Sequence, residues 1–232
     1  MKPLAVNCGT SKGIGFALSN WLLEEGWIVC GFSRNETRID HPQFYHFILD
    51  VSDEIKVVQM IASLRKDFGH IDALLNNAGI ESMNHITITP KESLKNIFQT
   101  NVFGSFLLLR EVFSLMISQK HCRIINFSSI TNPLNQKGVA TYASSKVAVE
   151  SLTQIATKEL GYYNITVNAI GPAPVQTNLI KKAPKFKIDS LLGRQAIKRL
   201  GTFEDIKNAV SFFLRPQSHF ITSQILYLGG VH

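Results

Sequence analysis

The chain has few cysteines and no long apolar run. Its three cysteines, Cys8, Cys30 and Cys122, lie in or beside short apolar stretches and lack the spacing of a metal site. An odd number of cysteines without such spacing indicates a reducing compartment rather than a disulfide framework. No segment approaches the roughly 18 apolar residues needed to cross a bilayer, and the N-terminus has no sustained apolar signal segment. We therefore expect a cytoplasmic protein without a metal site or a membrane partner.

The sequence also lacks a nucleic-acid-binding motif, although it is basic. Its 24 Lys and Arg residues exceed 17 Asp and Glu residues, which gives a formal net charge of +7. Most of these cations are spread along the chain, so the excess alone does not indicate a nucleic-acid partner, and we expect none. A late cluster is typical of a solvated loop, with a docking site for an acidic substrate or carrier as the alternative. It consists of Lys181, Lys182, Lys185 and Lys187.

Short apolar runs alternate with longer amphipathic stretches along the 232 residues. Strands are expected at 4–8, 27–32, 44–49, 71–76, 123–128, 165–170 and 224–228. Helices are expected at 13–25, 52–68, 91–118, 140–161 and 204–214. Strands that alternate with helices form right-handed βαβ units with a parallel sheet covered on both faces. The sequence therefore predicts an α/β fold: a single domain over 1–232 with a Rossmann-like, doubly wound parallel sheet of about seven strands.

Two connections between these elements are informative. The stretch 172–193 contains Pro172, Pro174 and Pro184 and is predicted to be irregular. It follows the sixth strand, and ligands bind beyond the carboxyl ends of parallel strands, so it is interpreted as a substrate-side lid, with partial disorder as the alternative. The segment 35–43 is too short for a full helix with its loops.

A glycine-rich loop follows the first strand directly and reads CGTSKGIG over 8–15. Glycines there let the backbone approach a pyrophosphate, whose charge the helix N-terminus stabilises. At the end of the second strand, where a carboxylate would select NAD, the chain has Arg34 instead. Arg34 could bind a 2′-phosphate, with Lys12 as a second nearby cation, so NADP(H) is favoured over NAD(H). The alternative is that both are ordinary solvated cations.

The stretch YASSK at 142–146 places a tyrosine and a lysine on one helix face. Together with the glycine loop, NNAG at 76–79 and the serine pair at 128–129, it makes the chain resemble a short-chain dehydrogenase/reductase. The resemblance extends from the first strand to LGG at 228–230. It implies a catalytic tetrad of Asn101, Ser129, Tyr142 and Lys146.

The resemblance also implies a set of cofactor contacts, which includes Tyr142 and Lys146. The others are Gly9, Ser11, Lys12, Gly13, Ile14, Gly15, Arg34, Asp50, Val51, Asn77, Ala78, Gly79, Pro172 and Thr177. Asn76 is expected to be structural. Bringing a tyrosine from its ordinary pKa near 10 to about 7 requires roughly 4 kcal/mol of phenolate stabilisation, part of which Lys146 could supply.

The resemblance implies hydride transfer between nicotinamide and a carbonyl or secondary alcohol, and a homo-oligomer, either a tetramer or a dimer. Two alternatives stay open. One is a 3-oxoacyl-carrier-protein reductase, although Tyr163 stands where such enzymes usually have a basic residue and only Lys120 remains for the other contact. The second is a catalytically silent nucleotide-binding relative, since fold and site can outlast activity.

Overall fold

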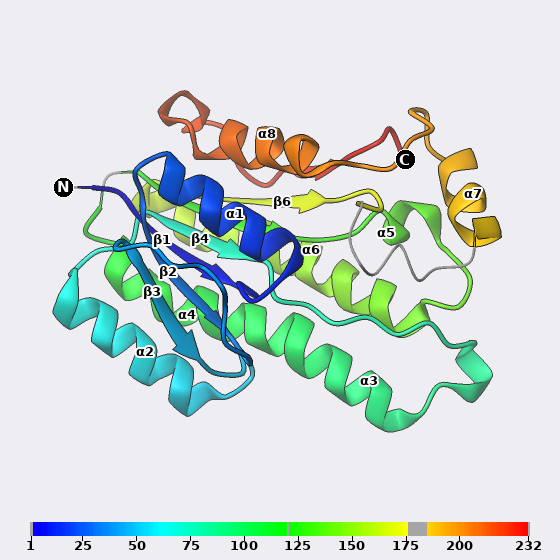
Figure 1. Ribbon diagram of the computed structural model, residues 1–232, viewed down its shortest axis with the longest axis horizontal. Coiled ribbons are helices and arrows are strands. Elements are labelled where there is room, and N and C mark those ends of the chain that lie inside the picture. Colours follow the sequence, from blue (N-terminus) through cyan, green and yellow to red (C-terminus); the bar gives the residue numbers. More distant parts are fainter. Residues whose placement is uncertain (1, 120, 176–184, 232) are drawn as a thin grey trace.

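The computed structural model describes residues 2–119, 121–175 and 185–231 and shows a seven-stranded sheet between two layers of helices (Figure 1). The strand order is β3-β2-β1-β4-β5-β6-β7, and neighbouring strands pair in parallel. The bounds are β1 Leu4–Cys8, β2 Ile28–Ser33, β3 Phe44–Ile48, β4 Ala73–Asn76, β5 Cys122–Phe127, β6 Ile165–Gly171 and β7 Ile225–Tyr227. This confirms the predicted doubly wound sheet.

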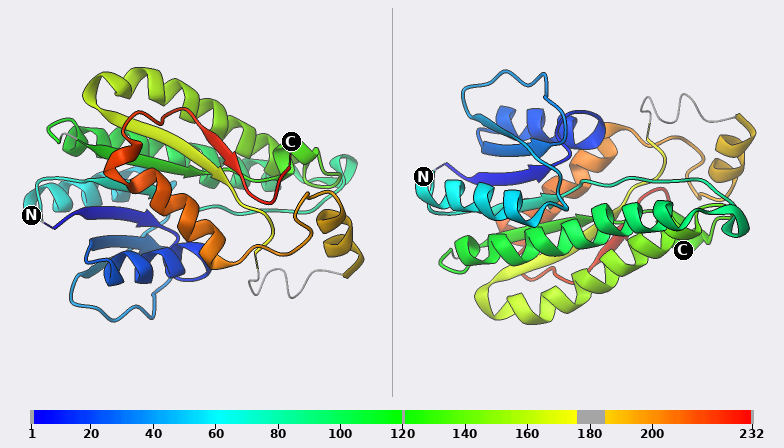
Figure 2. Two further views of the ribbon diagram at one scale, coloured as in Figure 1. Left: turned by 90° about the horizontal axis from the view of Figure 1, so that it is seen from above. Right: turned by 90° about the horizontal axis from the view of Figure 1, so that it is seen from below.

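Helices cover both faces of the sheet (Figures 1 and 2). One face carries α1 (Gly13–Glu24) and α8 (Phe203–Leu214), and the other carries α2 (Glu54–Asp67), α4 (Gly104–Met116) and α6 (Ala140–Leu160). A π-helical turn, η2 (Gln99–Phe103), joins α3 (Lys91–Phe98) to α4. The shorter elements are η1 (Ile86–Ile88), α5 (Thr131–Leu134), η3 (Gly161–Tyr163), α7 (Lys185–Gly193) and η5 (Pro216–Ser218).

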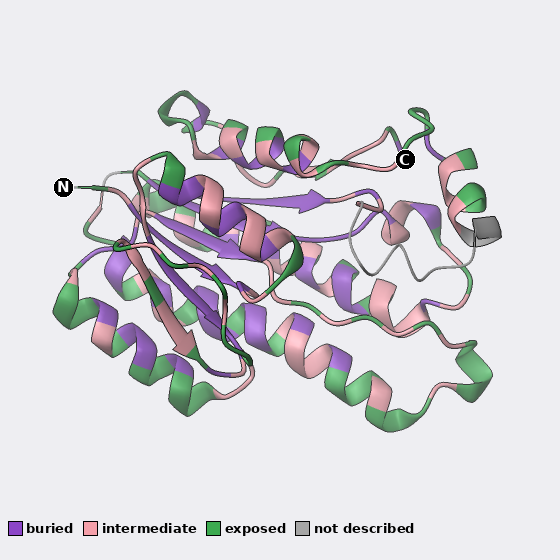
Figure 3. Cartoon of the chain, viewed as in Figure 1, coloured by how far each residue is buried: buried purple, intermediate pink, exposed green. Residues whose placement is uncertain are grey.

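The central strands are largely apolar because helices bury them from both sides. In β4, Leu74 packs into the cluster beneath α2 and α4, whereas the next residue, Leu75, packs into the cluster beneath α1 and α8. Both side chains are fully buried, and truncating either to alanine would cost about 2–5 kcal/mol. Figure 3 shows this buried centre between helices whose outer surfaces are exposed.

The predicted elements match the structure with small shifts of their ends. The first residue of the helix expected over 52–68 is Glu54, because the Asp53 side chain caps the helix by accepting a hydrogen bond from the Lys56 amide at 3.1 Å. The expected helix 91–118 is divided by the π-helical turn. No helix forms over 35–43, as predicted. The prediction that 172–193 is irregular is wrong for Lys185–Gly193, which forms α7.

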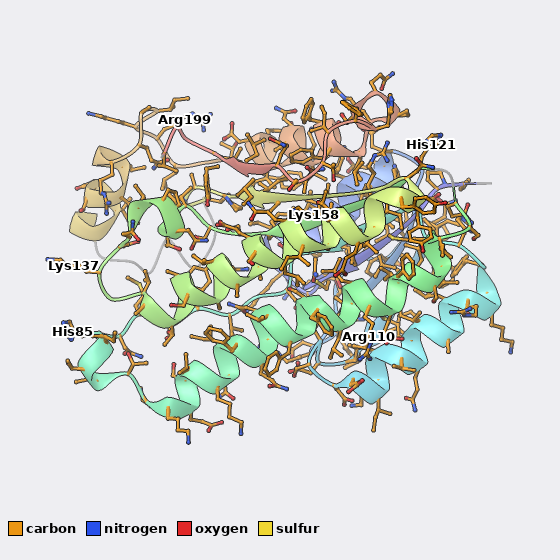
Figure 4. All side chains as sticks on the ribbon, turned by 180° about the vertical axis from the view of Figure 1, so that it is seen from behind. His85, Arg110, His121, Lys137, Lys158 and Arg199 are labelled. Carbon is orange, nitrogen blue, oxygen red and sulfur yellow. The ribbon has the colours of Figure 1, made fainter. Side chains whose placement is uncertain are left out.

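The described residues carry no helix both long and apolar enough to cross a bilayer. Within those same ranges, no three His, Cys, Asp or Glu side chains gather into a group able to hold a metal ion. The basic residues labelled in Figure 4 lie on separate parts of the surface, from Arg110 on α4 to Arg199 before α8. This spacing agrees with the spread of cations along the sequence.

Candidate active site

The glycine loop joins β1 to α1 at the carboxyl edge of the sheet. Gly9 has a φ of +80°, a conformation that a side chain would strain. A Cβ atom on Gly15 would lie 2.5 Å from the Gly9 carbonyl oxygen and 2.7 Å from Asn77 Nδ2, so only glycine fits there. The loop therefore has the close backbone approach that a pyrophosphate at the start of α1 requires, and a dinucleotide fits these residues.

The remaining loop residues are arranged around this turn. Ser11 and Ile14 are half-buried, Ile14 against the cluster beneath α1 and α8, while Lys12 and Gly13 are exposed. Lys12 is the N-cap residue of α1 in extended conformation. Its side chain thus branches from the backbone at the positive end of the helix, where an anion would be stabilised.

Arg34 follows β2 and is exposed. The backbone beside it is fixed, since the Ser33 hydroxyl donates a 2.6 Å hydrogen bond to the Asn35 carbonyl and lies 3.0 Å from His46 Nε2. Thr37 donates to the Thr10 carbonyl at 3.1 Å, which holds the segment after Arg34 against the glycine loop. The predicted 2′-phosphate contact therefore lies in a segment tied to the phosphate loop.

The loops after β3 and β4 lie next along the same edge. The Asp50 carboxylate accepts hydrogen bonds from the Ser52 amide at 2.9 Å and the Ser52 hydroxyl at 2.7 Å, and Val51 is buried. Asn77 Nδ2 donates to the Cys8 carbonyl at 3.1 Å, and the Ala78 amide donates to Cys8 Sγ at 2.9 Å. The bonds of Asn77 and Ala78 fix the loop after β4 to the end of β1, whereas those of Asp50 stay within the loop after β3.

The other asparagine of this motif has the structural role that the sequence predicts. Asn76 is buried and its Nδ2 donates to the Ser105 carbonyl at 3.1 Å. Gly79, three residues after Asn76, lies close to two residues of the predicted tetrad, because a Cβ atom there would be 3.3 Å from Lys146 Nζ and 3.4 Å from Asn101 Oδ1.

Asn101 is fully buried in the π-helical turn η2. Its Oδ1 accepts from the Ile80 amide at 2.9 Å, while Nδ2 donates to the Ile80 carbonyl at 3.0 Å and to Ser145 Oγ at 2.9 Å. Single π-helical turns occur frequently at functional sites. Here the turn places Asn101 between the loop after β4 and the helix that carries Tyr142 and Lys146.

Ser129, Tyr142 and Lys146 meet beyond the end of β5. Ser129 is buried and accepts a 3.2 Å hydrogen bond from the Thr131 amide, and its hydroxyl lowers the pKa of the nearby Tyr142 phenol. Lys146 Nζ lies 5.9 Å from the centre of the Tyr142 ring and donates a 2.7 Å hydrogen bond to the Phe127 carbonyl. Together with Asn101, the structure thus brings the four residues of the predicted tetrad into one site.

The electrostatics differ from the sequence expectation. Burial raises the pKa of Tyr142 to about 12; the Ser129 hydrogen bond opposes this rise and the Glu81 carboxylate adds to it. Burial lowers the pKa of Lys146 to about 8, whereas the nearby Cys8 and Glu81 act in the opposite direction and raise this pKa. Without ligand, Tyr142 is therefore a protonated acid, and Lys146 does not bring its pKa toward neutrality.

Two carboxylates at the site were missed by sequence reasoning. Glu81 comes two residues after Gly79, and Glu150 lies one helical turn beyond Lys146 on the face that also holds Tyr142. The signal for Glu150 was present, since Tyr142, Lys146 and Glu150 are spaced by four residues each. No comparable spacing marks Glu81.

The last predicted contacts lie after β6. Pro172 is half-buried, and its carbonyl accepts from the Ile130 amide at 3.5 Å. Val175 pairs with Gly201 in an isolated parallel bridge. Thr177 lies outside the described residues, so its predicted contact with the nicotinamide stays a prediction.

Known proteins are similar to this chain over nearly its whole length. The family described as enoyl-(acyl carrier protein) reductase matches residues 9–232. The 3-oxoacyl-[acyl-carrier-protein] reductase FabG of Escherichia coli strain K12 is 28% identical over 233 residues, covering 98% of this chain and 96% of its own. ElxO with NADP bound has a TM-score of 0.91 and 30% identity, covering 98% of this chain and 97% of its own. NAD+-bound xylitol dehydrogenase has a TM-score of 0.88 and 27% identity, with 98% of each chain covered.

The family match and the full-length relatives agree on one assignment. The parallel sheet of this chain, the glycine loop at its first turn and the serine, tyrosine and lysine beyond β5 accord with it. The chain belongs to the short-chain dehydrogenase/reductase family and is an NAD(P)-dependent enzyme that acts on CH–OH or C=O groups.

Proposed function

We propose that the protein transfers a hydride between NADP(H) and a carbonyl or secondary alcohol, with Tyr142 as the general acid and base. The observation that carries this proposal is the meeting of Ser129, Tyr142 and Lys146 beyond β5, where Lys146 Nζ lies 5.9 Å from the centre of the Tyr142 ring and donates a 2.7 Å hydrogen bond to the Phe127 carbonyl. A proton donor, a second hydrogen-bond donor and a cation then converge where a carbonyl oxygen would develop negative charge.

In the reductive direction, the Tyr142 hydroxyl donates its proton to the carbonyl oxygen, and Ser129 hydrogen-bonds the same oxygen. When bound, the nicotinamide supplies the hydride. A phenol with a pKa of about 12 is protonated at neutral pH, which suits this acid role. Forming the phenolate for the oxidative direction at pH 7 would cost about 7 kcal/mol unless a positive charge nearby offsets it.

Lys146 and Asn101 support this proton transfer. The Lys146 ammonium is positioned by the Phe127 carbonyl and would bind the ribose hydroxyls beside the nicotinamide. Asn101 uses both Nδ2 hydrogens within the protein, while Oδ1 can accept a further hydrogen bond from a water that resupplies the proton.

The preference for NADP(H) rests on Arg34 and Lys12. Both are exposed cations next to the glycine loop, and guanidinium groups bind phosphate in a bidentate geometry. The NADP bound in ElxO is in accord with this preference, while xylitol dehydrogenase holds NAD+ on the same fold. We further propose that the enzyme is a cytoplasmic homo-oligomer, a tetramer or dimer, whose substrate is a small molecule.

The full-length similarity to FabG favours one second candidate, a 3-oxoacyl-carrier-protein reductase. Against it, Tyr163 at the expected carrier contact packs edge-on against Phe113, with 5.1 Å between ring centres. Lys120, the remaining basic contact, lies outside the described residues. A small ketone or sugar is therefore the substrate class that we favour.

The test is NADPH oxidation with a panel of ketones, sugars and acyl thioesters. Tyr142→Phe should lower kcat by roughly 10²–10⁴-fold because it removes the proton donor, while the Kd for NADPH stays within about twofold. Tyr162→Phe is the matched control, since Tyr162 is 89% exposed on η3. Turnover by Tyr142→Phe at the parent rate would show that the tetrad is misassigned. If the parent protein binds NADPH but turns over no compound of the panel, the result would favour the alternative of a catalytically silent nucleotide-binding protein.

A further inference from the structure

Glu150 is the centre of a hydrogen-bond network beside the catalytic residues. Its Oε1 accepts from Asn132 Nδ2 at 2.7 Å, from the Tyr227 hydroxyl at 2.6 Å and from the Ser128 hydroxyl. The residue is half-buried on α6, eight residues after Tyr142. A partly buried carboxylate needs such partners, and hydrogen bonds to an ionised acceptor are stronger than neutral ones.

Neutral groups rather than cations hold this carboxylate. Within the described ranges, no Lys, Arg or His nitrogen lies within 4.0 Å of Glu150. Burial and the hydrogen bond to Glu150 raise the pKa of Tyr227, so the phenol remains a donor at neutral pH. The network therefore fixes geometry without neutralising the charge.

The donors come from separate elements, and two of them lie on either side of Ser129. Ser128 follows β5, and Asn132 lies in α5, with Ser129 between them in the chain. Asn132 Nδ2 also donates to the Ser128 hydroxyl at 3.2 Å, which closes the network across the turn. The backbone that carries the catalytic hydroxyl is thus held at both ends by one carboxylate.

The third donor links this turn to the edge of the sheet. Tyr227 belongs to β7, and its ring lies over the end of β6, where a Cβ on Gly171 would be 2.4 Å from Tyr227 Cδ1. The same Cβ would lie 3.4 Å from the Ser129 carbonyl carbon, so the ring and the turn share this corner of the site.

We propose that Glu150 is a positioning residue for Ser129: it fixes the 128–132 turn between α6 and β7, so that the Ser129 hydroxyl keeps its place next to α6, the helix that carries Tyr142. This inference rests on the proposed function for its catalytic consequence. Its structural consequence, the immobilisation of the turn, stands apart from activity.

The kinetic test compares Glu150→Ala, Glu150→Gln and Tyr227→Phe with the matched control Glu159→Gln, an exposed residue on the same helix. Glu150→Ala should lower kcat at least about tenfold while the Kd for NADPH stays within about twofold, and Gln should restore part of the loss because it keeps an acceptor. In a Ser129→Ala background, Glu150→Ala should lower kcat by no more than about twofold, because the residue it positions is gone. If the losses of kcat caused by Ser129→Ala and by Glu150→Ala multiply fully in the double variant, the proposal is overturned.

The structural test is hydrogen exchange of the peptide that contains 127–134, measured by mass spectrometry on the whole protein. Exchange should rise in Glu150→Ala and, less, in Tyr227→Phe, and stay at the parent level in Glu159→Gln. Unchanged exchange in the Glu150 variants would overturn the proposal even if activity fell. If the parent lacks turnover but exchange is still higher in Glu150→Ala than in the parent, the positioning proposal is supported although the proposed function has failed. If Glu150→Ala does not fold, Tyr227→Phe, which removes one donor only, decides by the same criteria.

Discussion

At the scale of single residues, the proposed preference for NADP(H) rests mainly on Arg34. It is exposed after β2, on backbone that Ser33 and Thr37 tie down. Arg34→Ala should raise the Kd for NADPH by about tenfold or more, because a charge-assisted phosphate contact is lost, and leave the Kd for NADH nearly unchanged. Fluorescence titration with both cofactors measures this, with the exposed Arg215→Ala as control. Equal affinities of the parent for NADPH and NADH would contradict the cofactor proposal.

The second prediction at the scale of single residues concerns Glu81. Its carboxylate raises the pKa of Tyr142 and also that of Lys146, since a negative charge disfavours the phenolate and favours the ammonium. Glu81→Gln should therefore shift the rising limb of kcat/KM for alcohol oxidation to lower pH, so that at a pH below this limb oxidation becomes faster. The pH profile of the variant, compared with that of Glu92→Gln on the exposed side of α3, checks the sign. If the rising limb of kcat/KM moves to higher pH in Glu81→Gln, or shifts equally in Glu81→Gln and Glu92→Gln, a direct effect of Glu81 is excluded.

Among the elements, the start of α4 controls how closely that helix approaches the loop after β3. A Cβ atom on Gly104 would lie 2.5 Å from Val51 Cγ1, and Val51 is an expected adenine contact. Gly104→Ala should thus destabilise the protein by about 1–3 kcal/mol through overpacking, and weaken NADPH binding, although alanine normally favours a helix. Urea denaturation and NADPH titration provide the measurements.

Gly161 supplies the matched comparison for Gly104. It has helical φ and ψ at the end of α6, and no atom lies within 4 Å of a Cβ built there. Gly161→Ala should leave stability unchanged or raise it by up to about 1 kcal/mol. Equal effects of the two substitutions would mean that the contact with Val51 does not constrain α4.

The alternation of strands and helices was predictable because each apolar run is short and separated from the next by an amphipathic stretch, which is a local property. The π-helical turn at Asn101 was not, because it depends on hydrogen bonds to Ile80 and Ser145 from other elements. The raised pKa of Tyr142 was missed for the same reason: burial follows from packing and outweighs the neighbouring hydroxyl. The Glu150 network joins residues up to 77 positions apart, so a local pattern could show only the shared helix face.

On the scale of the whole molecule, the parallel sheet explains why distant motifs form one site. The glycine loop after β1, the asparagine turn after β4 and the serine turn after β5 all leave the same edge, because every strand ends there. The long α6 then places Tyr142 and Lys146 against that edge. The order and common direction of the strands therefore bring the predicted site residues together.

The outer side of the layer formed by α4 and α6 leads to the last prediction, the association of copies of this chain. Phe106 on α4 is 49% exposed, and Val147 and Ile155 on α6 are about half exposed and spaced by two helical turns. The two long helices run side by side (Figure 2), and we expect these exposed side chains to form one apolar face. Burial of each such side chain in an interface would contribute up to about 1.5–3 kcal/mol.

A closed symmetric contact would use the face twice, so Phe106→Glu should shift the molar mass from light scattering toward that of the monomer. Ile55→Glu, at a 71% exposed apolar position on α2, is the control that should keep the parent mass. A monomeric parent, or a Phe106→Glu variant with the parent mass, would rule out association through this face.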